Sequence, residues 1–76
     1  MGGFVYMSDI VSVLINGERR DVPAGVNVTR MLGHLGLAAS RVAIERNLEI
    51  LSREKWDSVV VAAGDRYEIV HLVGGG

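Results

Sequence analysis

Three consecutive glycines, Gly74, Gly75 and Gly76, follow the apolar run of residues 67–73 at the end of the sequence. Glycine has no Cβ and adopts backbone conformations that other residues rarely reach, so these positions predict a flexible thread without side chains. Three extended residues span about 10 Å, enough to carry the carboxylate of Gly76 into another protein's active site. The sequence therefore favours Gly76 as the reactive group. The alternative is an inert end, because order is ordinarily lost at chain termini.

The other side chains that could do chemistry lack the partners they need. His34 and His71 have no cysteine or second histidine at ligand spacing, so we expect no metal site. No serine lies in a Gly-x-Ser-x-Gly turn, and no glycine-rich segment leads into Lys-Ser or Lys-Thr as a phosphate-binding loop requires. We therefore expect that the chain is not an enzyme in its own right.

The composition limits the remaining classes of function. With 76 residues and 49% hydrophobic content, the chain forms one small domain with little room for a deep active site. The net charge of −1 and the scattered basic residues argue against nucleic-acid binding. The absence of cysteine excludes disulfides and permits a cytoplasmic location, which we expect. No apolar run approaches the roughly 20 residues that cross a bilayer, so we expect no membrane contact.

A β-hairpin is expected to begin the domain. Residues 10–15 are rich in β-branched side chains and end at Asn16-Gly17, a dipeptide typical of tight hairpin turns. Residues 18–22 then return antiparallel to the first strand, and Pro23 stops the ladder because it cannot donate a backbone hydrogen bond.

A short amphipathic helix is expected next. Asn27 is a suitable N-cap, and Gly36 followed by Leu37 is typical of a Schellman-type end. Between them the apolar side chains recur at i, i+3, i+4 and i+7, on one helical face, as Val28, Met31, Leu32 and Leu35.

The second half of the chain predicts short strands. Residues 41–45 and 48–51 read as strands around a turn at Asn47, residues 53–56 as one helical turn capped by Ser52, and residues 66–73 as the last strand. This order predicts an α+β fold, with a mixed sheet of four or five strands and one main helix across one face. We expect a flexible leader at 1–9, the domain at 10–73 and the tail at 74–76.

Side-chain alternation in the last strand predicts an apolar outer face. If Tyr67 and Ile69 face the helix, then Val70 and Leu72 face away from it. Leu14 and Ala43 are expected on that same outer face, where exposed apolar patches usually mark partner surfaces. The alternative is that the leader or local packing covers them.

Several short motifs occur in a fixed order along residues 10–76. They are Asn16-Gly17, Pro23-Ala24-Gly25, the short helix, residues 42–50, Arg53-Glu54-Lys55-Trp56, Gly64-Asp65 and the ending 68–76. Together they resemble the ThiS-type sulfur carriers of thiamin biosynthesis, and the resemblance implies a ubiquitin-like β-grasp fold.

The resemblance also implies a reaction and its partners. The carboxylate of Gly76 would be adenylated by an E1-like, ThiF-type enzyme that uses ATP, and then converted to a thiocarboxylate with help from a sulfur donor system. A ThiG-type thiazole synthase would receive the sulfur. Gly74 and Gly75 would form the thread. Val70, Leu72, Val73 and Leu14 would bind partners, and no cofactor would be bound by the chain itself.

Three alternatives stay open at this point. A molybdopterin-synthase small subunit shares the fold and the terminal glycines, but this ending lacks the proline-rich approach common there. A ubiquitin-like modifier would use the same tail to join target lysines. An interaction module of β-grasp fold would carry an inert tail.

Overall fold

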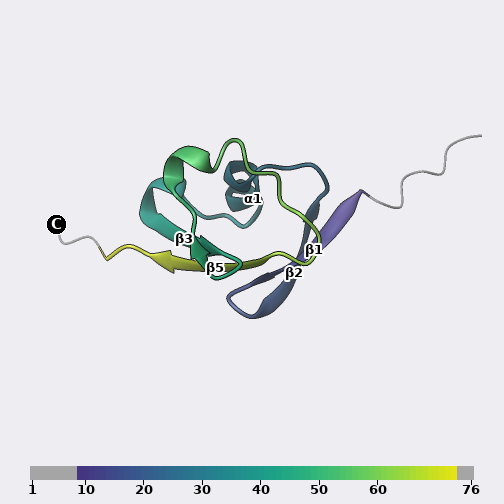
Figure 1. The fold of residues 1–76 in the computed structure, drawn as a ribbon, viewed down its shortest axis with the longest axis horizontal. Coiled ribbons are helices and arrows are strands. Elements are labelled where there is room, and N and C mark those ends of the chain that lie inside the picture. The colour runs from purple at the N-terminus through teal and green to yellow at the C-terminus, as the bar shows by residue number, and fades with distance from the viewer. Residues whose placement is uncertain (1–8, 74–76) are drawn as a thin grey trace, which may run out of the picture.

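A computed structural model describes residues 9–73 and shows a five-stranded sheet with one helix across one face (Figure 1). The strands lie in the order β2-β1-β5-β3-β4; β1 is parallel to β5, and the other neighbours are antiparallel. The predicted α+β architecture with a mixed sheet is confirmed. The elements are β1 (Ile10–Ile15), β2 (Glu18–Pro23), α1 (Val28–His34), the 3-10 helix η2 (Ala39–Arg41), β3 (Val42–Arg46), β4 (Glu49–Ile50), the 3-10 helix η3 (Arg53–Lys55) and β5 (Arg66–His71).

The hairpin of β1 and β2 turns where the sequence predicted. Asn16 and Gly17 have φ angles of 52° and 84°, the left-handed pair that a two-residue turn matching the strand twist requires. The second strand reaches Pro23, one residue beyond the expected end, and Pro23 lies opposite Ile10. Proline is tolerated there because β2 is an edge strand.

Both ends of α1 are capped as predicted. The side chain of Asn27 accepts a hydrogen bond from the backbone N–H of Arg30 at 2.8 Å. At the other end Gly36 has a φ of 75°, its N–H donates to Gly33 at 3.1 Å, and the N–H of Leu37 donates to Leu32 at 2.9 Å. This pair of bonds is the Schellman arrangement. A seven-residue helix is too short to persist alone, so packing must hold it in place.

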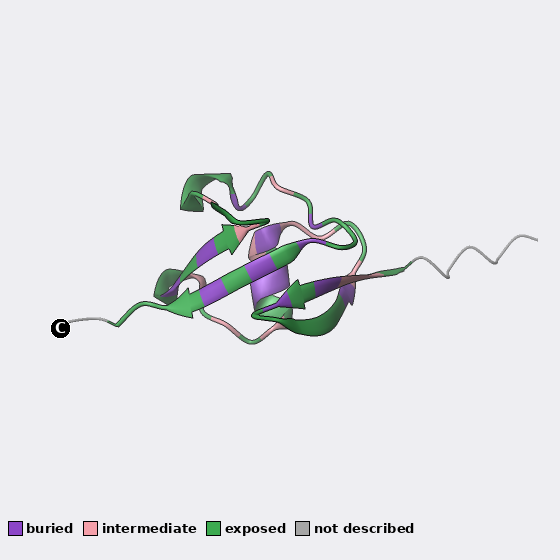
Figure 2. Cartoon of the chain, turned by 60° about the horizontal axis from the view of Figure 1, so that its bottom comes forward, coloured by how far each residue is buried: buried purple, intermediate pink, exposed green. Residues whose placement is uncertain are grey.

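The core lies between α1 and the facing side of the sheet. Figure 2 shows the alternation of buried and exposed residues along β5 in front of α1, whose buried residues are Val28, Met31 and Leu32. The buried apolar residues are Val13, Ile15, Val22, Val28, Met31, Leu32, Val42, Ile44, Trp56, Val61, Tyr67 and Ile69.

The turn before Trp56 differs in detail from the prediction. Ser52 makes no side-chain capping bond; the backbone N–H of Lys55 donates to the Ser52 carbonyl at 2.9 Å instead. Trp56 closes the core edge as expected, with its indole N–H donating to the Leu51 carbonyl at 2.9 Å. The Arg53 guanidinium lies 4.5 Å from the centre of the Trp56 ring, a cation–π contact that covers its outer side.

One buried carboxylate joins the start of β5 to the rest of the sheet. Asp65 is 6% exposed and accepts hydrogen bonds from the Tyr67 hydroxyl at 2.8 Å, the Ala62 N–H at 3.0 Å and the Asn47 amide at 3.2 Å. Arg46 adds an ion pair at 3.0 Å. No buried side-chain nitrogen or oxygen in the described part of the chain lacks a partner. The Asp65 cluster therefore meets the requirement for burying a charge, which is full pairing.

The cluster shifts the ionisation of its members. Burial alone would raise the pKa of Asp65, but the hydrogen bonds from Ala62, Tyr67, Asn47 and Arg46 outweigh burial and hold that pKa below its ordinary value of 3.8. Burial, followed by the hydrogen bond to Asp65, raises the pKa of Tyr67 to about 12. The hydrogen bond that the Arg46 guanidinium donates to the Tyr67 hydroxyl is the largest of the contributions that raise the pKa of Arg46.

Replacing Asp65 by asparagine should lower the free energy of unfolding by about 2 kcal/mol, because the substitution removes the charge to which three side chains donate hydrogen bonds. The pKa of Asp65 is depressed on folding, so its stabilisation is complete above pH 3.8 and is lost as the pH falls through the lower folded value. Denaturant titrations between acid and neutral pH measure both effects. Asp21→Asn, in the exposed pair with Arg19, is the matched control and should change stability little.

Tyr67 should ionise at a higher pH than an ordinary tyrosine does. In a Tyr6→Phe variant Tyr67 is the remaining tyrosine, and its ultraviolet titration should have a midpoint near pH 12 rather than 10.0. Because the pKa is raised on folding, the stabilisation by Tyr67 is complete below pH 10.0 and is lost as the pH rises toward about 12. A midpoint at the ordinary tyrosine value in the folded variant would contradict the buried cluster.

Candidate functional site

The end of β5 determines where the chain leaves the domain. The strand ends at His71, not at the predicted residue 73, because its partner β3 begins at Val42 and Val42 pairs with His71. One more bond, from the Leu72 N–H to the Arg41 carbonyl at 2.8 Å, holds the chain beside η2. Val73 follows and is 94% exposed. Gly74, Gly75 and Gly76, the predicted thread and reactive group, lie outside the described residues.

A side chain from the first hairpin holds β5 from its other side. The Asn16 amide donates to the Ile69 carbonyl at 3.1 Å, and the Asn16 side-chain oxygen accepts from the Ile69 N–H at 2.8 Å. These two bonds have the pattern of a strand pair, and they lie just beyond Tyr67, the last β5 residue that β1 pairs with. Asn16 therefore extends the ladder by one residue toward the exit of the chain. The sequence marked Asn16 as a turn residue and gave no signal of this second role.

The outer face of the sheet carries the predicted partner residues, but not as one continuous patch. Val70 and Leu72 are 56% and 51% exposed, and Ala43 lies directly opposite Val70. Leu14 is also on this face, but it pairs with Arg66, four positions before Val70 and thus about 13 Å along the strand. The structure brings Ala43 and Val70 together and leaves Leu14 apart.

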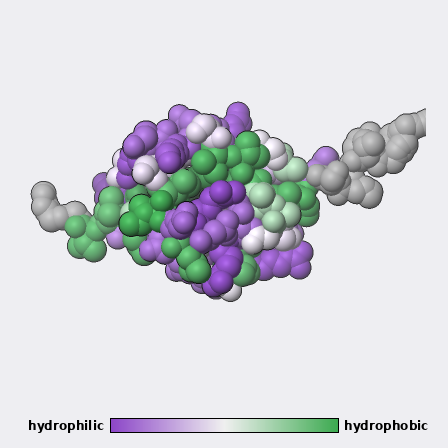
Figure 3. Space-filling model, in the orientation of Figure 1, coloured by the Kyte–Doolittle hydropathy of each residue, from purple (hydrophilic) through white to green (hydrophobic). Residues whose placement is uncertain are grey.

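Sequence reasoning missed Ile50 on the same face. Ile50 is 83% exposed and pairs with Glu45 of β3. Glu45 is on the outer face, two residues after Ala43. The register of the turn at Asn47 could have revealed it, because residues opposite each other share a face. Figure 3 shows hydrophobic surface at the end of the molecule where β5 leaves it.

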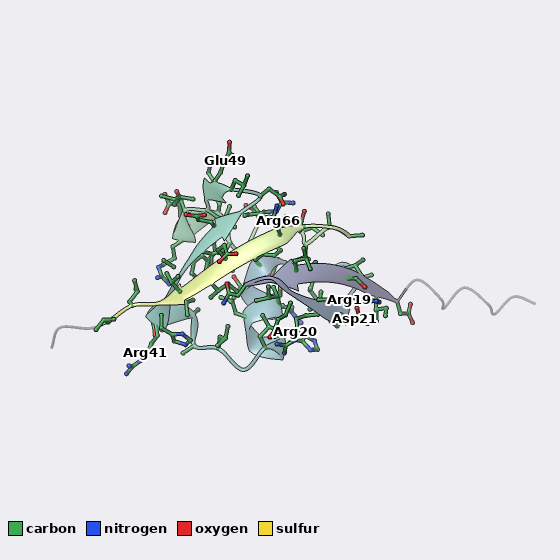
Figure 4. All side chains as sticks on the ribbon, turned by 90° about the horizontal axis from the view of Figure 1, so that it is seen from below. Arg19, Arg20, Asp21, Arg41, Glu49 and Arg66 are labelled. Carbon is green, nitrogen blue, oxygen red and sulfur yellow. The ribbon has the colours of Figure 1, made fainter. Side chains whose placement is uncertain are left out.

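Charged side chains flank the outer face. Figure 4 views the sheet with α1 behind it, with Arg66 near the start of β5, Arg19 and Asp21 on the side of β2, and Glu49 at the opposite edge. Between these flanks lies a shallow groove of about 200 Å³, which we call the outer groove. Its lining residues are Ala43, Ile44, Glu45, Ile50, Glu68 and Val70.

The two histidines lie in separate hollows on other parts of the surface. His71 lines a hollow of about 330 Å³ with Asn16, Arg20 and Leu37, and His34 lines another with Val26 and Arg30. Among residues 9–73 no group of three or more His, Asp or Glu side chains is placed to hold a metal ion. In that same part of the chain no helix is long and apolar enough to cross a membrane.

Solved structures place the fold in a known class. The crystal structure of the thiamine biosynthesis protein ThiS from Geobacter metallireducens superposes with a TM-score of 0.75 at 36% identity, covering 87% of this chain and 100% of that one. A solution structure of an N-terminal ubiquitin-like domain, 19% identical, matches with a TM-score of 0.53 over 100% of this chain and 88% of that one, and shows the fold alone. The protein is thus a ubiquitin-like β-grasp domain.

Sequence comparison narrows this class to one family. The model of the ThiS family matches residues 13–76, and the chain belongs to that family. This is the family of sulfur carriers that the motifs of the sequence resemble.

A longer relative contains a similar segment. The thiazole synthase of Paramagnetospirillum magneticum is 44% identical over 66 residues, which cover 87% of this chain and 20% of that protein. The chain therefore spans about a fifth of the length of the thiazole synthases that it matches.

Val70→Asp and Leu72→Asp should leave the fold intact, because both side chains are exposed. The free energy of unfolding should change by less than about 1 kcal/mol in either variant. Ile69→Asp is the matched contrast: Ile69 is 5% exposed, and an unpaired charge there should cost about 4 kcal/mol or more. Cooperative denaturation curves measure these differences, and loss of cooperativity in the Val70 or Leu72 variant would show that side chain to belong to the core.

Proposed function

We propose that this protein carries sulfur on its last residue, Gly76, for formation of the thiazole of thiamin. The observation that carries the proposal is the family match, which extends from residue 13 through Gly76 and so includes the glycines. The fold supports it, because the bonds of β5 to β3 and Asn16 hold the chain firmly up to Leu72. A rigid body that ends in side-chain-free residues suits delivery of a carboxylate into a narrow channel.

The chemistry begins from an unreactive group. A terminal carboxylate has an ordinary pKa of about 3.3–3.7, so it is ionised at neutral pH and resists nucleophiles. In the proposed first step a carboxylate oxygen attacks the α-phosphorus of ATP, pyrophosphate leaves, and an acyl-adenylate forms. Hydrosulfide supplied by the donor system then adds to the acyl carbon through its sulfur, AMP leaves, and loss of the S–H proton leaves a thiocarboxylate on Gly76.

The partner enzymes supply the catalytic groups in this proposal. A ThiF-type adenylating enzyme provides the ATP site and the groups that stabilise developing charge, and the carrier itself binds no cofactor. The carrier contributes recognition through Val70, Leu72, Val73 and Leu14, while Gly74 and Gly75 form the thread to Gly76. Exposure of Leu14, Val70, Leu72 and Val73 in the structure supports this division of roles.

A thiazole synthase is the proposed recipient of the sulfur. Support comes from the proteins named thiazole synthase that contain a segment 44% and 38% identical to this chain. The proposal places these steps, and the sulfur donor system, in the cytoplasm.

Deleting Gly75 and Gly76 should abolish adenylation while the domain still unfolds cooperatively, because the deletion lies beyond every described contact of residues 9–73. The measurement is intact mass after incubation with ATP, the adenylating enzyme and a sulfur donor. The full chain should gain AMP and then show one terminal oxygen replaced by sulfur.

Val70→Asp should lower the rate of adenylation, because it weakens binding to the adenylating enzyme while Gly76 is unchanged.

Two results would contradict the proposal. Adenylation of the truncated chain at the same rate would remove Gly76 from its role. Isopeptide conjugates of the chain with target lysines in cells, without any thiocarboxylate, would identify a modifier instead of a carrier.

A further inference from the structure

The outer groove combines an apolar floor with two acidic walls. Val70 and Ile50 are 56% and 83% exposed; on the strand between them, Ala43 lies opposite Val70 and Glu45 lies opposite Ile50. Glu45 and Glu68 line the same groove and are exposed. The groove is therefore shaped to cover an aliphatic stem and to place a positive charge at the carboxylates.

The two glutamates are direct cross-strand neighbours. Glu45 of β3 pairs with Glu68 of β5. Side chains opposite each other in antiparallel strands have Cβ atoms about 5 Å apart, and like charges at such positions destabilise the sheet. The pair therefore costs the isolated domain stability unless a cation lies between the carboxylates.

The described part of the chain supplies no such cation. Its ion pairs join Arg19 to Asp21 and Arg46 to Asp65, and neither involves the two glutamates. Arg66 lies two positions from Glu68 on the same face, yet no ion pair or hydrogen bond joins the two among residues 9–73. The groove thus has two carboxylates without an internal cation among the described residues, beside apolar side chains that an external group can contact.

We propose that the outer groove binds an arginine side chain presented by a thiazole synthase. This inference rests on the proposed function, from which it takes the identity of the partner. The arginine stem would lie over Ala43, Val70 and Ile50, and the guanidinium would lie between Glu45 and Glu68. The groove shares Val70 with the proposed partner surface, so the two contacts are continuous.

An arginine fits this groove better than a metal ion. Ca²⁺ requires six to eight oxygen ligands and Mg²⁺ six, whereas two carboxylates over an apolar floor offer few. A guanidinium has donors on several edges and can bond two carboxylates at once, and its weak hydration suits an apolar surround. The long aliphatic stem also covers the exposed side chains that a metal ion would leave in water.

Calorimetric titration of the full chain with the thiazole synthase of the same organism tests the proposal. Glu45→Gln combined with Glu68→Gln should weaken binding about tenfold or more and reduce its dependence on salt. Glu18→Gln combined with Glu54→Gln removes the same charge from other exposed positions and should change the affinity little. The thermal midpoint of the double Glu45 and Glu68 variant should stay or rise, because a repulsion is removed.

A single charge reversal sharpens the test. Glu45→Lys puts a lysine stem opposite Glu68, which should fill the groove from within the chain. The variant should melt at a higher temperature than the wild type and bind the synthase more weakly than Glu45→Gln does. A structural role of the glutamates would produce the opposite change in melting temperature.

Each other outcome overturns a stated part of the proposal. Unchanged synthase affinity in the double variant, with thiocarboxylate still formed, would refute the groove and leave the proposed function standing. A lowered melting temperature would show that Arg66 or another internal cation holds the glutamates. If the double variant bound only the adenylating enzyme more weakly, or lost a homodimer that the wild-type chain forms, the occupant of the groove would not be a thiazole synthase. A chain that neither binds the synthase nor forms thiocarboxylate would refute both proposals.

Discussion

The architecture depends on the buried carboxylate of Asp65. It gathers Arg46 and Asn47 from the β3 end, Ala62 from the preceding loop and Tyr67 from β5. A buried charge is tolerated only when its partners are in place, and a shift of β5 relative to β3 would take Asp65 away from Arg46 and Asn47 and leave it without its cation. One electrostatic constraint at the start of β5 thereby sets which residues face the helix and which face outward.

The local elements could be predicted from the sequence because short-range chemistry determines them. The turn at Asn16-Gly17 needs left-handed backbone, and the caps of α1 at Asn27 and Gly36 use bonds within a few residues. The alternation in β5 follows from the period of two that any strand has. These features depend on neighbours in the chain, which a sequence displays directly.

Features set by distant contacts were not predictable in the same way. The register that places Glu45 opposite Glu68 arises across the long segment between β3 and β5, and no local pattern specifies it. Leu48 has a φ of 74°, a conformation rare for leucine, because it is the second central residue of the two-residue turn that Arg46 and Glu49 close, after Asn47 with a φ of 53°. The separation of Leu14 from Val70 is likewise a matter of register.

The pairing of β5 with β3 also makes the number of residues in this strand important. Each residue of a strand advances the chain by about 3.3 Å and reverses the side of the next side chain. Inserting one residue after Asp65 would move His71 beyond its partner Val42, turn Tyr67 outward and lengthen the reach of the tail by one step, all at once. Evolution can therefore exchange side chains along residues 66–73 far more freely than it can change their number, so the length of this segment should vary less among related carriers than its composition.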